Sequence, residues 1–275
     1  MCAKQHVRPP AVAGMFYEDS PSLLRKNVEE YLDNAQVSKP KHPVRGIVSP
    51  HAGHVYSGLA AAHAYKLIQG NTYECIIAVG PSHREYFGGV SIYPGEAYET
   101  PLGTVPVQAE IRDELVSQCT SIVMTTAGHR SEHCLEVQLP FLQVVLGEFP
   151  FVPIIMGDQD RRFCNELAKA IARVAAHRNI LLVASSDLSH FHPYDEAVEL
   201  DHRVINELEK FNPESFIDKI EARSFEACGG GPIAAVMKSA KSLGATEAEV
   251  LYYCNSGDIT GDKSGVVGYL AAAFL

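Results

Sequence analysis

The sequence predicts an α/β protein: a three-layer α/β/α sandwich around a largely parallel central sheet. Short and almost continuously apolar segments, such as 45–50, 73–82 and 179–187, are typical of strands that are buried on both faces. Segments with apolar residues at helical spacing lie between them, which is typical of strands joined by crossover helices. We expect one domain spanning residues 1–275, because chains of about 250 residues often form a single α/β domain.

The first half of the chain gives clear local signals. The first predicted helix, 18–35, has Ser20 as its cap and Pro21 in its first turn, where the missing N–H costs nothing. After it we expect, in order, a strand at 45–50, a helix at 58–70, a strand at 73–82, short strands at 88–95 and 103–108 that form a hairpin-like excursion, and helices at 109–118 and 135–146. Pro140 should kink or divide the last of these helices.

The second half continues the alternation. We expect, in order, a strand at 151–157, a helix with Phe163, Leu167, Ile171 and Val174 on one face, a strand at 179–187, a helix with Val198, His202, Ile205 and Leu208 along one side, helices at 214–222 and 232–244, and closing apolar segments at 248–258 and 264–275.

Composition excludes several classes of protein. The formal net charge is -10 and no cluster of Lys and Arg stands out, so we expect no nucleic-acid partner. The longest apolar runs fall short of the roughly 20 residues that span a bilayer, and the amino terminus lacks the apolar core of a signal peptide, so we expect a cytoplasmic protein without a membrane partner. Seven scattered cysteines without a C-x-x-C pair argue against a disulfide framework or a zinc ribbon.

Two predicted strands end in the same way. In "VSPHAGH" (48–54) and "VGPSHRE" (79–85) a proline breaks the apolar segment and a histidine follows, at His51 and His83. The strand at 179–187 ends with Asp187, and His190 follows it closely. Ligands bind outside the carboxyl ends of strands in open α/β sheets, so we expect these side chains to share one crevice.

Two neutral imidazoles near one point suit zinc, copper or iron, and an anionic side chain would complete the site. Cys228 is the candidate, because it precedes the glycine-rich start of a helix whose amino end favours a thiolate. The alternative is that Cys228 is a small buried apolar residue. Asp187 is expected to orient an imidazole or a metal-bound water, or else to cap a helix, and His190 to act as a general acid or base.

Other polar residues leave alternatives open. Glu132 is either a capping carboxylate or, with His133, a residue that reaches the crevice, and Glu136 is expected on a solvent-exposed face. The side chains that could line or overhang the crevice are His54, Tyr56 and His192. The histidines expected to be ordinary surface or packing residues are His6, His42, His63, His129, His177 and His202.

Several segments together resemble the Memo-like family, which shares a fold with class III extradiol dioxygenases that use non-haem iron. They are "RPPAVAGMFY" (8–17), "SPHAGHVYSG" (49–58), "VGPSHR" (79–84), "EHCLEVQLPF" (132–141), "SSDLSH" (185–190) and "CGGGPIAAV" (228–236). The resemblance implies that His51, His83 and Cys228 are metal ligands, with Asp187 and His190 beside them. The dioxygenases complete their triad with a glutamate, and a cysteine instead makes the site softer, favouring copper or zinc without excluding iron.

Bacterial and archaeal chains of this kind are similar to the B proteins of AmmeMemoRadiSam systems. This similarity implies a radical SAM protein and an AMMECR-domain protein as partners. We expect a non-haem iron or copper redox protein with a His/His/Cys site. The alternatives are a module that binds a protein or peptide in an enzyme-like crevice and a zinc-dependent hydrolase.

Overall fold

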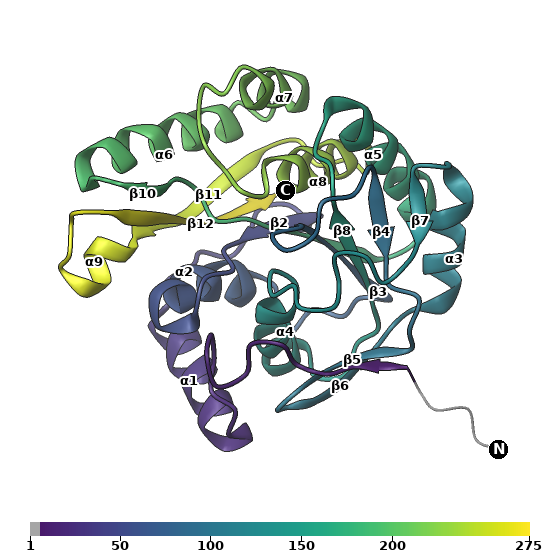
Figure 1. Ribbon diagram of the computed structural model, residues 1–275, viewed down its shortest axis with the longest axis horizontal. Helices are drawn as coiled ribbons and strands as arrows, with labels where there is room; N and C mark the ends of the chain where they lie inside the picture. Colours follow the sequence, from purple (N-terminus) through teal and green to yellow (C-terminus); the bar gives the residue numbers. More distant parts are fainter. Residues whose placement is uncertain (1–5) are drawn as a thin grey trace.

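A mixed nine-stranded sheet forms the middle layer of the computed structural model, which describes residues 6–275 (Figure 1). Its strands run in the order β10-β12-β2-β9-β3-β8-β4-β7, and β11 pairs with β12. Their bounds are β2 Gly46–Ser49, β3 Cys75–Pro81, β4 Val90–Ile92, β7 Ile122–Met124, β8 Phe151–Met156, β9 Ile180–Ser185, β10 His190–His192, β11 Ala248–Asn255 and β12 Val266–Phe274. The central strands β2, β9, β3 and β8 are parallel, as predicted, whereas β10, β11 and β12 make antiparallel pairs at one side.

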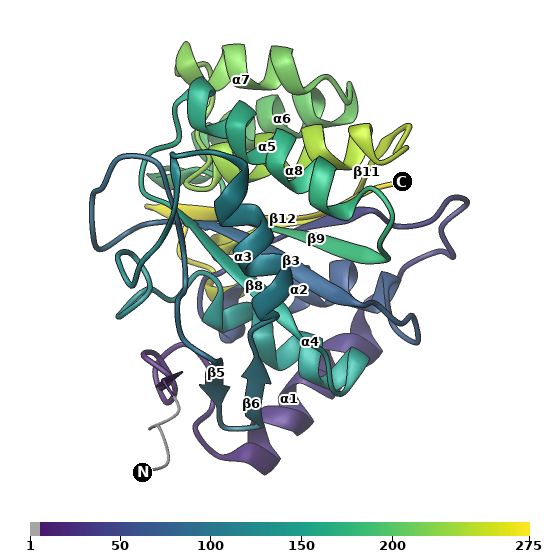
Figure 2. The same cartoon turned by 90° about the vertical axis from the view of Figure 1, so that its right-hand side faces the viewer.

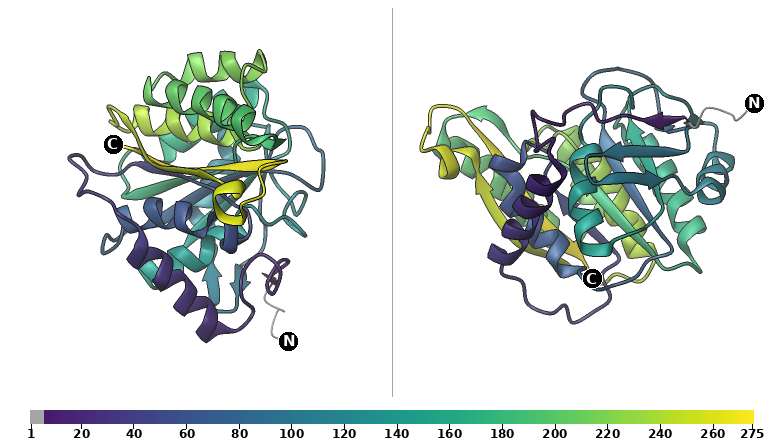
Figure 3. Two further views of the ribbon diagram at one scale, coloured as in Figure 1. Left: turned by 90° about the vertical axis from the view of Figure 1, so that its left-hand side faces the viewer. Right: turned by 90° about the horizontal axis from the view of Figure 1, so that it is seen from below.

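Helices cover both faces of this sheet. Figures 2 and 3 show one layer above the sheet, formed by α5 (Arg161–Ala175), α6 (Tyr194–Glu209), α7 (Pro213–Glu221) and α8 (Gly230–Ser242). The opposite layer contains α1 (Pro21–Asn34), α2 (His54–Leu67) and α4 (Leu139–Leu146). Helix α3 (Ala109–Gln118) packs against α5 and β7, and the short α9 (Ser256–Thr260) packs against β12. The predicted three-layer α/β/α architecture is confirmed. Within residues 6–275, no helix is both long and apolar enough to span a membrane.

Adjacent residues of the central strands pack into different hydrophobic cores, one on each face of the sheet. In β2, Val48 packs into the core beneath α5 and α8, while Ile47 packs against α1, α2 and α4. In β3, Ile77 and Ile76 divide in the same way. Successive strand side chains point to opposite faces, so a sheet covered on both faces requires apolar residues at every position. This explains the continuous apolar runs in the sequence.

A small second sheet corrects one expectation. The expected excursion of strands at 88–95 and 103–108 is not one hairpin: β4 joins the main sheet, antiparallel to β8. The hairpin is instead formed by β5 (Ala97–Thr100) and β6 (Gly103–Pro106), and β1 (Val7–Arg8) pairs with β5. Pro140 divides the predicted helix at 135–146, since a 3-10 turn at Glu136–Gln138 precedes α4.

Candidate metal centre

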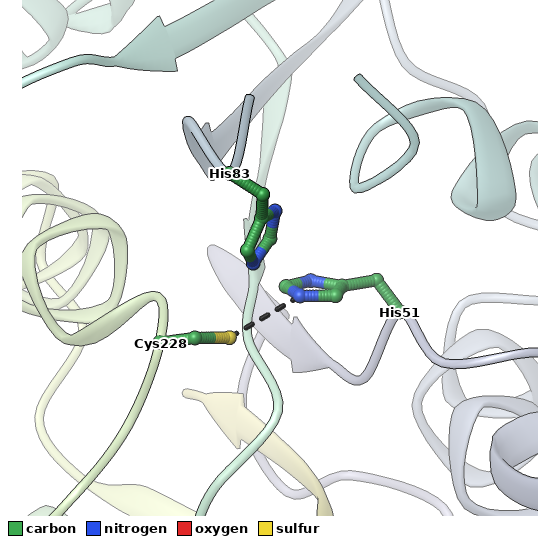
Figure 4. A group of neighbouring side chains, drawn as sticks. All are labelled: His51, His83 and Cys228. Carbon is green, nitrogen blue, oxygen red and sulfur yellow. Dashed lines mark hydrogen bonds between the residues drawn. The ribbon is translucent and has the colours of Figure 1, made fainter. Parts of the chain in front are cut away.

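The carboxyl ends of three adjacent strands bring the predicted residues together. Strands β2, β9 and β3 are neighbours in the sheet and parallel to one another. His51 follows β2, Asp187 follows β9 and His83 follows β3. Cys228 reaches the same place from the loop that precedes α8. Figure 4 shows the side chains of His51, His83 and Cys228 pointing toward one another from three separate segments.

His51 is held through its backbone N–H and one nitrogen of its ring. Its backbone N–H donates to Asp187 Oδ1 at 2.7 Å, and its Nδ1 lies 2.8 Å from Ser185 Oγ. Only 1% of the residue is exposed, and this burial lowers the pKa of His51 to about 4. The imidazole is therefore neutral near pH 7, and its Nε2 faces the sulfur of Cys228 at 3.2 Å. Neutral imidazole is the form that binds metals.

His83 is oriented by Glu132. The backbone N–H of His83 donates to Glu132 Oε2 at 2.6 Å, and Nδ1 of the ring lies 3.0 Å from Oε1. Burial opposes ionisation of Glu132, but the contacts with His133 and His83 outweigh it and hold the pKa of this carboxyl well below its usual range. An ionised carboxylate keeps the ring proton on Nδ1, so Nε2 of His83 has a free electron pair that can bind a metal. This is the usual arrangement behind a metal-binding histidine.

Cys228 lies two residues before α8 and next to the turn that carries Asp187. Its sulfur accepts the backbone N–H of Asp187 at 3.2 Å, and its own N–H donates to the Asp187 carbonyl at the same distance. Burial, together with the nearby Asp187 carboxylate, raises the pKa of the Cys228 thiol well above its ordinary value. This rise outweighs the lowering of the pKa expected from the helix terminus and favours the protonated thiol. A bound cation would be needed to convert it to thiolate.

The donor set fits a transition metal. One ligand atom from each of His51, His83 and Cys228 lies within 4.8 Å of the other two. The centroids of the two imidazole rings are 5.0 Å apart. Each histidine is held through Nδ1, so both offer Nε2 to the same space. Two imidazoles and one sulfur are a soft to intermediate donor set, suited to copper, zinc or iron.

Asp187 and His190 lie beside this group. The Asp187 carboxylate is buried and binds the backbone of His51, while its Oδ2 is 3.9 Å from the ring nitrogen Nε2. No helix begins after it, since β10 follows, so the helix-cap alternative for Asp187 is wrong. Nδ1 of His190 lies 2.9 Å from the Leu188 carbonyl oxygen. His190, Cys228 and Phe225 are among the residues that line a cavity of about 290 Å³.

The structure settles the open alternatives for three further residues. Glu132 and His133 do reach the crevice, because the His133 ring lies 5.4 Å from that of His51 and 4.9 Å from that of His83. His54 does not, since it bonds to the Val137 carbonyl at 3.1 Å and packs on Phe141.

The remaining residues named from the sequence make no hydrogen bond to the donor group. His192 makes ion pairs with Glu196 and Glu226 at the surface. Tyr56 is 41% exposed, and the structure gives it no hydrogen bond to the donor group. Two of the histidines expected to be ordinary packing residues are bonded elsewhere, His63 to the Leu59 carbonyl and His129 to the Tyr98 hydroxyl.

Glu136 corrects another expectation. It is fully buried instead of solvent-exposed, and its carboxylate pairs with Arg8 at 2.7 Å. It also accepts the backbone N–H of Val12 and the Tyr17 hydroxyl. Arg8 in turn bonds the backbone carbonyl of Glu132. The segment 8–17 is thereby tied to the loop that orients His83. The only sequence signal for this contact was an arginine within an otherwise apolar amino-terminal motif.

Comparison with known proteins agrees with the fold and with the resemblance. The family model for "Memo-like protein" matches residues 8–273. A MEMO1 family protein of Methanopyrus kandleri is 38% identical over 97% of this chain and 98% of the relative's length, and one of Sulfolobus acidocaldarius is 39% identical over 98% and 99%. An uncharacterized protein, JW3007 of Escherichia coli K12, shares the fold with a TM-score of 0.60 at 14% identity, over 85% of this chain and all of that one. The chain belongs to the Memo-like family.

Proposed function

We propose that this chain is a metal-binding redox protein that holds one iron or copper ion through His51, His83 and Cys228. The observation that carries the proposal is the convergence of these three ligand atoms within 4.8 Å of one another. Each histidine has its second nitrogen occupied, which fixes the tautomer that a metal needs. A purely structural cluster would not require two imidazoles to present the same free nitrogen to one sulfur.

The sulfur of Cys228 limits which metals the site would prefer. Thiolate and imidazole together favour copper, zinc and iron over magnesium or calcium, which prefer oxygen ligands. Iron or copper bound here would supply one-electron chemistry on a small ligand. Zinc would serve the hydrolase alternative, in which a bound water becomes the nucleophile.

The protein's own groups have separable roles in this proposal. Asp187 holds the backbone of His51, and Glu132 holds both the backbone and the ring of His83. His190 lines the cavity next to Cys228, where it can hold or deliver a proton to a ligand. Burial of His51 keeps its imidazole neutral, which is the form that can bind a metal.

Elemental analysis of anaerobically purified protein tests the proposal. We expect about one iron or copper per chain, with a spectrum that changes on reduction. The His51→Ala variant should lose that metal, whereas His54→Gln should retain it, because His54 is equally buried but bonded elsewhere. Zinc in place of iron or copper would favour the hydrolase. A wild-type chain that binds no metal under any of these conditions would contradict the proposal.

A further inference from the structure

A buried carboxylate outside the ligand set lies beneath the turn that carries Asp187 and His190. Asp201, on α6, is 0% exposed, and no Lys or Arg of residues 6–275 pairs with it. Burial raises the pKa of Asp201, and the hydrogen bonds from Ser189 and Tyr253 oppose that rise. A buried carboxylate without a cation is costly, so its position requires an explanation.

Both oxygens of Asp201 have a donor. Oδ1 accepts the backbone N–H of Ser189 at 2.9 Å, and Oδ2 accepts the Tyr253 hydroxyl at 2.8 Å. The same turn is bonded to β12, since Leu188 N–H donates to the Gly268 carbonyl and Gly268 N–H donates to the Ser189 carbonyl. The turn is therefore held from α6 and from β12, and β11 supports the carboxylate through Tyr253.

The carboxylate fits only because residue 268 is a glycine. A Cβ at this position would lie 1.9 Å from Asp201 Oδ2, which is less than any non-bonded contact allows. The space occupied by Asp201 is thus created by the absence of a side chain on the neighbouring strand. Any larger residue at 268 must displace the carboxylate and so disturb its hydrogen bonds with Tyr253 and Ser189.

The other side of the turn contacts the candidate metal centre. The N–H of Asp187 donates to Cys228 Sγ, and Nδ1 of His190 is bonded to the carbonyl of Leu188 within the turn. We propose that Asp201 is a positioning residue that fixes this turn and thereby the orientation of His190 relative to Cys228. The inference rests on the proposed function only in the importance it gives to His190.

Three variants separate positioning from general stability. Gly268→Ala inserts a methyl group where the carboxylate lies and should displace Asp201 from Ser189. Gly265→Ala, three residues earlier, is the matched control, since a Cβ there would make only ordinary contact, 3.5 Å from the Phe191 carbonyl. Tyr253→Phe removes a single hydrogen bond to Asp201 and is the milder test if Gly268→Ala fails to fold.

The readout is the imidazole ¹H–¹³C NMR signal of His190 in the metal-free chain at fixed pH, assigned with His190→Gln. Gly268→Ala should shift the signal clearly and Tyr253→Phe should shift it by less, while Gly265→Ala leaves it in place. In the cobalt(II)-loaded chain, the thiolate-to-metal absorption band should shift in the same order of variants. A His190 signal that stays at its wild-type position in every folded variant, with only the melting temperature lowered, would overturn the proposal. Because the NMR measurement needs no metal, a wild-type chain that binds no cobalt would contradict the proposed function alone.

Discussion

Replacing Glu132 by glutamine removes the support of one proposed ligand without touching any ligand. The carboxylate accepts four N–H groups: the backbone N–H and Nδ1 of His83, and the backbone N–H groups of His133 and Cys134. A glutamine of the same shape has one carbonyl oxygen, so its NH₂ group must face at least one of these donors. Three of the donors share Oε1, so the NH₂ group fits best at the Oε2 position, which accepts only the backbone N–H of His83. The ring of His83 then loses its negative partner, and its backbone N–H loses its acceptor.

The expected loss follows from the role of such partners. Removing a carboxylate behind a metal-binding histidine typically lowers metal affinity by about 10- to 100-fold. This corresponds to roughly 1.4–2.8 kcal/mol of binding free energy. We expect the upper part of this range, because Glu132 positions the backbone of His83 as well as its ring.

A competition titration with zinc under reducing, anaerobic conditions measures the change, and circular dichroism establishes that the variant is folded. Glu207→Gln is the matched control, since Glu207 is also buried and its carboxylate is bonded by Lys210, directly after α6, and by Ser215 on α7. The control should bind zinc like the wild type. An unchanged affinity in folded Glu132→Gln would refute the claim that this carboxylate supports a metal ligand.

Three further predictions concern proton handling. His190→Gln should retain the metal content while changing turnover or the pH profile of the metal-bound species; loss of metal equal to that of His51→Ala would make His190 a ligand. Because the raised pKa of Cys228 leaves its thiol protonated near neutrality, metal binding should displace one proton, and affinity should rise by about tenfold per pH unit; a pH-independent affinity would exclude a thiolate ligand. Burial lowers the pKa of both His51 and His54 to about 4, against an ordinary value of 6.5, so below pH 6.5 the unfolded chain binds protons that the folded chain does not. Stability should therefore fall between pH 6.5 and 4, less steeply in His54→Gln, and equal urea midpoints at pH 7 and 5 would contradict this.

The sequence was informative where local pattern and topology coincide. Apolar runs that end in a proline and a histidine predicted both the parallel strands and the shared edge at which His51 and His83 meet, because parallel strands end on the same side. Cys228 was harder to assign from residues alone. Its place before a helix was visible, but its distance from His51 depends on how the loop after α7 returns to the sheet.

Contacts between remote segments could not be predicted. Glu132 and Glu136 lie in one short segment. Glu132 was expected either to cap or to reach the crevice and it orients His83, whereas Glu136 was expected to face solvent and is buried against Arg8. Their roles depend on the amino-terminal segment, which crosses this loop. A contact of that kind produces no periodic pattern in the sequence. The sequence assigned no role to Asp201, which shares the buried face of α6 with Ala197 and Val204, and only the glycine opposite it shows how a carboxylate fits there.

Metal titration of the Cys228→Ser variant tests the central claim most directly. Serine keeps nearly the same volume but offers a hard and usually protonated hydroxyl. Cys75→Ser and Cys254→Ser are the controls, since both cysteines are buried outside the donor group. We expect folded Cys228→Ser to lose most of its affinity for copper and zinc, with a smaller loss for iron, while both controls bind like the wild type. Wild-type affinity in Cys228→Ser would show that the His/His/Cys site is wrong, and Asp187 would then be the better candidate for the third ligand.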